Sequence, residues 1–344
     1  RKWNMLPYKV ILIVRAGAPD ASMADIALAM SEQGYTAAAI MGGVDAVGEK
    51  TSSLAANFKK MGLTAQEAVR YSSDLSPDDR LRWLIKNGYR PTEYIQYVDF
   101  LSSSNHSVAI LRESGLSAND LAKLMVQYKN IGFYSAARAL YDGGFTTIKE
   151  VAGALISAGS YPAMVPYYIQ KIGGWTLKEV AKGMLDSGLI SLVDLVEALQ
   201  IADDYNLKIT YQIIKEVSTA ERQAFFDALS SLERQFLNND EIAMIITASA
   251  FRNANISLHD VATQLLRTDE EYDLGTALKV LIMAGFNALD VADTMWDVYR
   301  DVIGIKIIQT MFERAAKQVI PDFMQYYKIA KTLYTIVNKV SAAV

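Results

Sequence analysis

Cysteine is absent from the 344 residues of the chain. This excludes disulfides, catalysis by a thiolate, and zinc or iron–sulfur sites built on cysteine. Histidine is almost absent too, since only His106 and His259 occur. His106 stands in a polar turn and His259 follows a helix start, so we expect both at the surface and predict no metal site and no catalytic residue.

Proline and glycine are scarce, with 7 and 20 residues. All-β folds need more turn residues than this. The sequence contains no apolar run of roughly 18 residues, so we expect no membrane span. The most apolar short run lies within residues 5–15, which we expect to form a buried first helix or a short strand. It is too short to favour a signal peptide.

The chain carries no excess of positive charge. It has 34 basic and 38 acidic residues, for a net charge of −4. Phosphate neutralisation supplies much of the affinity of nucleic-acid-binding proteins, so a nucleic-acid partner is disfavoured. The compartment stays open. The lack of cysteine, together with a first residue that is arginine and suggests processing or truncation, favours an extracellular or virion setting slightly over the cytoplasm.

One phrase recurs along the chain: glycine, a bulky residue, serine or threonine, two free positions, an acid, and an aliphatic–alanine pair. It stands as Gly62-Leu63-Thr64…Glu67 and as Gly174-Trp175-Thr176…Glu179-Val180-Ala181. Other copies contain Ser22, Thr36, Arg90, Ser117, Thr147, Ser191, Ser257 and Asn287 at the hydroxyl position or its equivalent.

Each phrase has a direct physical interpretation. The hydroxyl accepts a hydrogen bond from a free N–H in the first helical turn, and the acid three residues later bonds back to the cap. Glycine ends the preceding helix because it adopts a left-handed backbone at little cost. The phrase therefore predicts a joint between two helices. We expect the alanine to lie where paired helices cross closely.

Cap positions along 36, 64, 90, 117, 147 and 176 lie 26 to 30 residues apart. This spacing leaves room for two short helices with tight turns. We therefore predict an all-α fold, a right-handed α-solenoid of roughly ten helix–turn–helix repeats of about 27–30 residues. The expected organisation is a repeat block over 1–202, an irregular helical segment over 203–250 in which Ser218 and Asn238 still resemble caps, and C-terminal repeats with a long capping helix over 251–344.

The strings FTTIKEVAGAL and WTLKEVAKGML resemble the first helices of helix-pair solenoid families, including TALE-like and HEAT-like repeats. The likeness covers the repeat phrase only. It implies a stacked helical array. The DNA-reading role of TALE-like repeats does not carry over, because the period here is shorter, a regular variable residue pair is lacking and the charge is unsuited to wrapping a duplex.

Two further patterns suggest chemistry but fit it poorly. Residues 43–51 resemble a phosphate-binding loop, yet Glu49 stands where the lysine should directly follow Gly48, and no strand precedes them. We expect a joint between helices there. Adjacent acids such as Asp78-Asp79, Asp203-Asp204 and Glu270-Glu271 point apart on loops, whereas paired carboxylate catalysis needs facing groups.

Tyrosine is the one residue type in notable excess, with 19 copies. Tyrosine gives a large contact area at low entropic cost, so a strip of exposed rings would bind a protein. Packing between repeats is the alternative. The candidate interaction surface comprises Tyr94, Tyr97, Tyr161, Tyr167 and Tyr168.

These observations favour a scaffold or structural protein over an enzyme, with no cofactor. We expect a protein partner or self-assembly, as a subunit of a virion, filament or other large particle. The alternatives are a nucleic-acid-binding helical repeat protein and, less favoured, an enzyme with a site between repeat blocks near 203–250.

Overall fold

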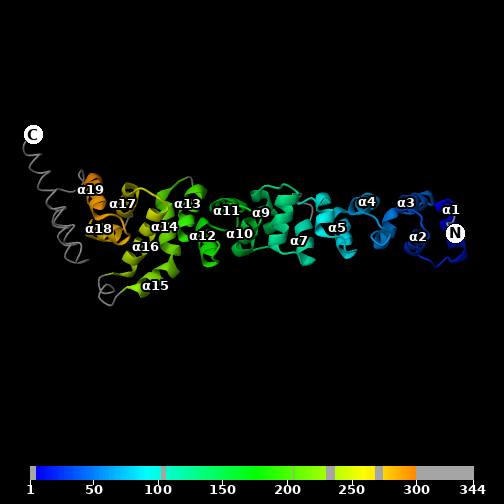
Figure 1. Ribbon diagram of the computed structural model, residues 1–344, viewed down its shortest axis with the longest axis horizontal. Helices are drawn as coiled ribbons and strands as arrows, with labels where there is room; N and C mark the ends of the chain where they lie inside the picture. The colour runs from blue at the N-terminus through cyan, green and yellow to red at the C-terminus, as the bar shows by residue number, and fades with distance from the viewer. Residues whose placement is uncertain (1–4, 102–105, 204, 230–236, 268–273, 300–344) are drawn as a thin grey trace, which may run out of the picture. The chain divides into compact units, whose positions relative to one another are not determined.

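The computed structural model describes residues 5–101, 106–203, 205–229, 237–267 and 274–299 (Figure 1). Helices cover 72% of the described residues, which contain no strand. The all-α prediction is therefore confirmed. The chain divides into two compact units, Arg1–Ser160 and Tyr161–Val344.

The first unit is a succession of short helices joined by tight turns. In chain order they are α1 (Pro7–Gly17), α2 (Met23–Glu32), α3 (Ala37–Ala46), η1 (Thr51–Asn57), α4 (Ala65–Tyr71), α5 (Pro77–Lys86), α6 (Pro91–Tyr94), η2 (Ile95–Tyr97), α7 (Ser107–Glu113), α8 (Ala118–Lys123), the π-helical turn η3 (Leu124–Tyr128), α9 (Phe133–Asp142) and α10 (Ile148–Ser157).

Helices of the first unit contact their neighbours but one in the chain when α6 and η2, which are continuous, count as one helix, and α8 and η3 likewise. α1 packs on α3 and α2 on η1; farther along, α5 packs on α7 and α7 on α9. A second series consists of α4, α6, α8 and α10, each of which begins at a copy of the recurring phrase: α4 contacts α6, α6 contacts η3 and α8 contacts α10. Two interleaved rows of helices result within this unit.

The second unit follows the same arrangement with one interruption. Its elements are η4 (Pro162–Met164), α11 (Val165–Ile172), α12 (Leu177–Asp186), α13 (Leu192–Ala202), α14 (Leu207–Val217), α15 (Thr219–Ala228), α16 (Asn239–Asn253), α17 (Leu258–Arg267), α18 (Leu274–Met283) and α19 (Ala288–Tyr299).

Helix α15 stands outside the alternation of the second unit. α11 contacts α13, α12 contacts α14, α16 contacts α18 and α17 contacts α19. α13 also contacts α16, and α14 contacts α17, so these pairs are neighbours but one only if α15 is left out of the order. α15 packs on α16, buries no residue of its own and extends to one side of α16 in Figure 1.

The recurring phrase marks helix starts as predicted. Thr64 accepts a hydrogen bond from the N–H of Glu67 (3.3 Å), and the Glu67 carboxylate accepts one from the N–H of Thr64 (2.9 Å). Gly62, which ends the preceding turn, has a φ of 79°, a conformation that glycine adopts readily. The same reciprocal pair forms at Thr147–Glu150 and Thr176–Glu179.

Aspartate at the acid position behaves differently from glutamate. The Ser117 hydroxyl donates to the Asp120 carboxylate (2.6 Å) and accepts from the Asp120 N–H (3.2 Å), as the threonine hydroxyls do with glutamate. The bond from the backbone N–H of the cap to the carboxylate, which completes the capping box with glutamate, does not form at Ser117 or Ser191. We attribute the difference to the missing methylene of aspartate, which shortens its reach toward the backbone N–H of the cap.

The alanines after the acid lie in the core. Ala122 and Ala152 of the first unit are fully buried, and so are Ala181 and Ala262 of the second. Gly43 has a similar role: a Cβ there would lie 2.7 Å from the Cβ of Pro7, so its lack of a side chain lets α3 approach the start of α1. The residues around it form a helix end and a turn, which fits the predicted joint.

Within the described ranges, no helix is long and apolar enough to cross a membrane. Several expectations fall outside those ranges. They concern Asp204, the Glu270-Glu271 pair and the long capping helix expected at the end of the 251–344 block.

Candidate interaction surface

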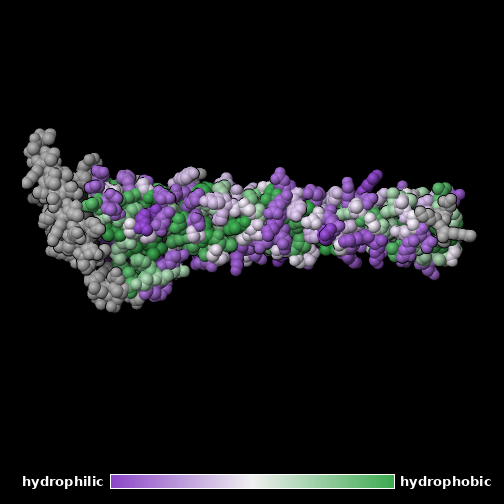
Figure 2. Space-filling model, viewed as in Figure 1, coloured by the Kyte–Doolittle hydropathy of each residue, from purple (hydrophilic) through white to green (hydrophobic). Residues whose placement is uncertain are grey.

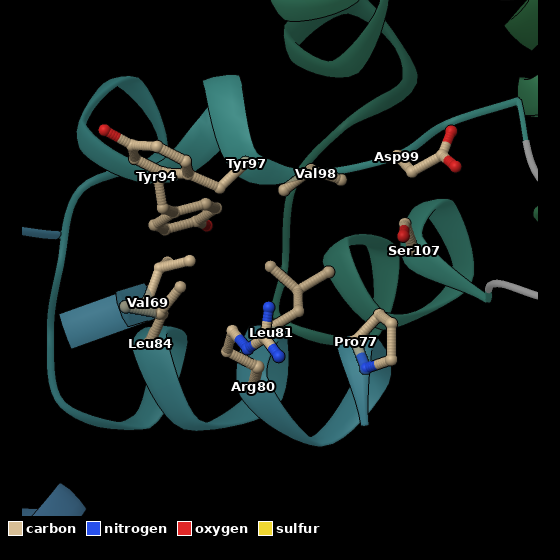
Figure 3. Close-up of a pocket in the computed structure, with 10 residues that line it drawn as sticks. All are labelled: Val69, Pro77, Arg80, Leu81, Leu84, Tyr94, Tyr97, Val98, Asp99 and Ser107. Atoms are coloured by element: carbon tan, nitrogen blue, oxygen red, sulfur yellow. The ribbon is translucent and has the colours of Figure 1, made fainter. Parts of the chain in front are cut away.

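A small pocket in the first unit lies among α4, α5, α6, η2 and the start of α7 (Figure 3). In Figure 3 the Tyr94 ring points toward Val69 and Leu84, while the Tyr97 ring points away from them. The space measures about 30 Å³, enough for little more than a water molecule. It is too small for an organic substrate.

Arg80 is the cationic residue of this pocket, and its guanidinium is already engaged. It donates hydrogen bonds to the carbonyls of Ser72 (3.2 Å), Ser73 (3.3 Å) and Leu75 (3.0 Å). These bonds fix the turn that joins α4 to α5. We therefore interpret Arg80 as a structural residue.

The two tyrosines predicted in this unit have opposite environments. Tyr94 is 1% exposed, and burial raises the pKa of its hydroxyl to about 12. Tyr97 is 43% exposed. Tyr94 thus packs in the core, whereas Tyr97 is available at the surface.

A second exposed tyrosine lies one repeat farther on. Tyr128, which is 50% exposed, is the last residue of the π-helical turn η3. Gln96 donates a hydrogen bond to the Tyr128 carbonyl (2.7 Å), and Lys129 donates one to the Gln96 carbonyl (2.8 Å). These two bonds tie η2 to η3, the elements that carry Tyr97 and Tyr128.

Sequence reasoning missed Tyr128, Tyr134 and Leu101, which are also exposed. A usable signal was present, because Tyr97 and Tyr128 stand 31 residues apart, close to the period of the repeats. Residues at one repeat position tend to share one face of a stacked array.

Of the three tyrosines predicted in the second unit, Tyr161 directly precedes η4, and Tyr167 and Tyr168 lie on α11. Tyr161 is 58% exposed and donates a hydrogen bond to the Glu197 carboxylate (3.2 Å), which raises the pKa of the Tyr161 hydroxyl. Tyr167 and Tyr168 contact each other edge to face at 5.8 Å, and Lys171 lies 4.1 Å from the centre of the Tyr167 ring. This group is thus a local cluster of its own, half-buried at Tyr167 and Tyr168.

Basic residues of both units are largely bound to groups close by. Lys182 pairs with Asp186 (2.8 Å) and Arg82 with Glu113 (3.4 Å). Lys178 pairs with Glu216. Such neutralised cations are poorly suited to binding a phosphate backbone.

Both histidines are exposed, as predicted. His106 lies 3.0 Å from the Asp78 carboxylate through Nδ1, and its side chain is 72% exposed. His259 is 66% exposed. Within the described ranges, no three acidic or histidine side chains come together in a way that could hold a metal ion.

The chain matches no family model, and no curated protein or solved structure matches it.

Hydrophobic residues gather over α11 to α14 on the face shown in Figure 2, whereas hydrophilic residues are more frequent over α5 and α7.

Proposed function

We propose that this chain is a non-catalytic scaffold, a right-handed α-solenoid of roughly ten helix-pair repeats that binds proteins or copies of itself. Its setting would be a larger particle or filament, such as a virion or an extracellular assembly. The observation that carries the proposal is the contact pattern in each unit, where helices pack on their neighbours but one. Such stacking produces extended surfaces that are suited to binding macromolecules.

The exposed tyrosines support a protein partner. Tyr97 and Tyr128 lie on elements that contact each other, so the first unit presents two rings on adjacent repeats. Tyrosine is enriched among the residues that dominate protein interfaces. The second unit offers Tyr161 and the Tyr167–Tyr168 pair as a separate contact area.

The non-catalytic part of the proposal is supported by how the acids are used. Glu67, Glu150 and Glu179 bond to the helix starts that they cap. General acid–base catalysis instead needs carboxyl or imidazole groups that face a substrate site with shifted pKa values.

The test is the size of the protein in its native setting. An extract of the source cells or particles would be separated on a density gradient and probed with an antibody to this chain. We expect it to sediment far ahead of a 38.0 kDa protein. Sedimentation as a free 38.0 kDa chain in every fraction, at its natural abundance, would overturn the proposal.

A further inference from the structure

Helix α15 is held in the second unit by far fewer buried side chains than its neighbours in the chain. None of its residues is buried, whereas α14 buries five and α16 buries nine. The stack also closes without α15, because α13 contacts α16 directly and α14 contacts α17. Segments with few buried contacts are the first to open in a folded protein. Movement of α15 away from α16 would therefore leave the rows of stacked helices in place.

The packing between α15 and α16 is incomplete. A cavity of about 280 Å³ lies between the two helices, far larger than the space of about 30 Å³ in the first unit. Protein interiors leave few voids larger than a water molecule. Side chains beside such a void lose the contacts that would hold the two helices together. Among the described residues, those that line it are Thr219, Arg222, Gln223 and Phe226 of α15 and Asn239 and Ile242 of α16.

Polar atoms in the first turn of α15 are buried without a hydrogen bond. They are Oε2 of Glu221 and Nε of Arg222, and the hydroxyl of Ser218 just before the helix is in the same condition. A buried polar group without a partner destabilises the arrangement that buries it, because water would bond to it once it is exposed. Movement of α15 that admits water to Glu221 and Arg222 would therefore be favoured by the hydrogen bonds formed there.

The joint between α14 and α15 is a single residue. α14 ends at Val217 and α15 begins at Thr219, so Ser218 alone separates them. The Ser218 N–H donates to the Ile214 carbonyl (3.1 Å) and its carbonyl accepts from the Arg222 N–H (3.0 Å), while its ψ of 39° bends the chain. Residues at the end of a helix can absorb a change of backbone angle that swings the next element. Ser218 is therefore placed to act as a hinge.

We propose that α15 is a releasable cover on α16, hinged at Ser218, which opens while the rest of the second unit stays folded. Opening uncovers the side of α16 that carries Ile242, a residue only 2% exposed in the closed position. A molecule that binds this side of α16 shifts the equilibrium toward the open position, because the closed position does not present it. The inference goes beyond the scaffold function and does not depend on it.

The absence of cysteine makes thiol labelling a direct test, since a single introduced cysteine is the only group that reacts. Ile242→Cys places the thiol beside the cavity. Met244→Cys is the matched control, because Met244 is 1% exposed and lies about 200° farther around the same helix. In the full chain, iodoacetamide should label Ile242→Cys at least about 100-fold faster than Met244→Cys, which reacts only when the stack unfolds. Equal labelling rates would overturn the inference.

A proline within α15 tests whether this helix is the cover. Ala224→Pro breaks α15 near its middle at an exposed position. It should speed the labelling of Ile242→Cys by at least about 10-fold, leave that of Met244→Cys unchanged and barely move the urea midpoint of unfolding. Lys182→Pro, at an exposed position of α12 in the stack, is the control and should lower that midpoint. No change at Ile242→Cys, or equal acceleration at both thiols, would refute the cover.

Hydrogen exchange of the unsubstituted chain, followed by mass spectrometry, tests the same opening without any cysteine. Peptides from α15 should exchange at least about 100-fold faster than peptides from the middle of α14 and α16. Protection of α15 equal to that of α16 would overturn the inference. Exchange of α14 as fast as that of α15 would also contradict it, because the opening would then not begin at Ser218.

Discussion

The helix starts of α12 and α16 differ sharply from the helix start of α15, although all three lie in the second unit. Thr176 and Asn238 each accept a hydrogen bond from the N–H three residues on. Ser218, at the start of α15, is fully buried, yet its hydroxyl makes no hydrogen bond, and α15 has no side-chain cap. The first two helices bury residues in the stack and the third does not.

Among these three helices, the two with a side-chain cap bury residues in the stack and the uncapped one does not. A cap is not required for a place in the stack, since α11 also lacks one and is held by its buried residues. Further buried polar atoms without a hydrogen bond belong to Glu221 and Arg222 of α15, and to Asp203 at the end of α13 and Thr210 within α14. Leaving such groups unbonded costs stability. The α15 region is thus the weakly bonded interruption of an otherwise regular series.

Removing the glutamate at the third position of each helix should give the largest difference in the free energy of unfolding between α16 and α15. Glu241 of α16 is 7% exposed, accepts a hydrogen bond from the N–H of Asn238 (2.9 Å) and pairs with Lys279 of α18. Glu241→Ala should lower the free energy of unfolding by about 3 kcal/mol, because it breaks the cap and removes the ion pair with Lys279, whose side chain is only 13% exposed. Glu221→Ala in α15 should change it by less than about 0.5 kcal/mol. Urea denaturation followed by circular dichroism measures both, and equal losses would contradict the contrast.

Alanines of the two regions should respond differently to added volume. Ala181 of α12 is fully buried, so Ala181→Leu should destabilise the protein by about 2 kcal/mol through overpacking. Ala224 of α15 is exposed, and Ala224→Leu should be nearly neutral. The same denaturation measurement applies. A neutral Ala181→Leu would mean that the helices around α12 do not pack as described.

Removing the hydroxyl at the helix start should lower the free energy of unfolding for α12 and leave it nearly unchanged for α15, a smaller difference than the two above. Thr176→Ala removes the bond that the Glu179 N–H donates and should cost about 1 kcal/mol. Ser218→Ala removes a buried hydroxyl that bonds to nothing and should be neutral or slightly stabilising. A loss at Ser218 as large as that at Thr176 would show that Ser218 caps α15 after all.

The smallest expected effect concerns how the contribution of Glu179 to stability depends on pH. The backbone N–H of Thr176, and then its hydroxyl, donate to the Glu179 carboxylate and lower its pKa below 4.5. Because the folded pKa is depressed, the contribution of Glu179 is present above about pH 4.5 and is lost as pH falls through the folded value. NMR titration should find the Glu179 pKa below that of a free glutamate, and Thr176→Ala should return it toward 4.5. A Glu179 pKa unchanged by Thr176→Ala would contradict this.

Much of the local structure could be predicted from the sequence because it depends on residues three or four apart. The caps at Thr64, Thr147 and Thr176 are of this kind. Near Ser257 the phrase lacks its glycine, but Asn255 adopts a φ of 60° in its place, which asparagine tolerates. Ser218 was expected to act as a cap, and this was wrong, since its backbone continues from α14 almost without a break.

What the sequence could not predict depends on contacts between repeats. Tyr94 and Tyr97 stand three residues apart, and only the packing of α4 and α5 decides that the first is buried and the second exposed. The run over residues 5–15 was expected to be a buried helix or a strand. It forms a helix, but α3 covers only one side of it and leaves Leu12 and Ile13 exposed.

The central claim, that each recurring phrase is a joint between repeating helix pairs, is tested most directly by excising one whole repeat. Deleting Ser117–Thr146 removes α8, η3 and α9, whereas deleting Ser117–Ile131 removes only α8 and η3. Circular dichroism should show that the first deletion keeps the helicity per residue of the full chain and still unfolds cooperatively, because α10 can take the place of α8 in its row. The second deletion should lose helicity and cooperativity, since it leaves two helices of one row in succession. Equal loss of structure in both would contradict the account.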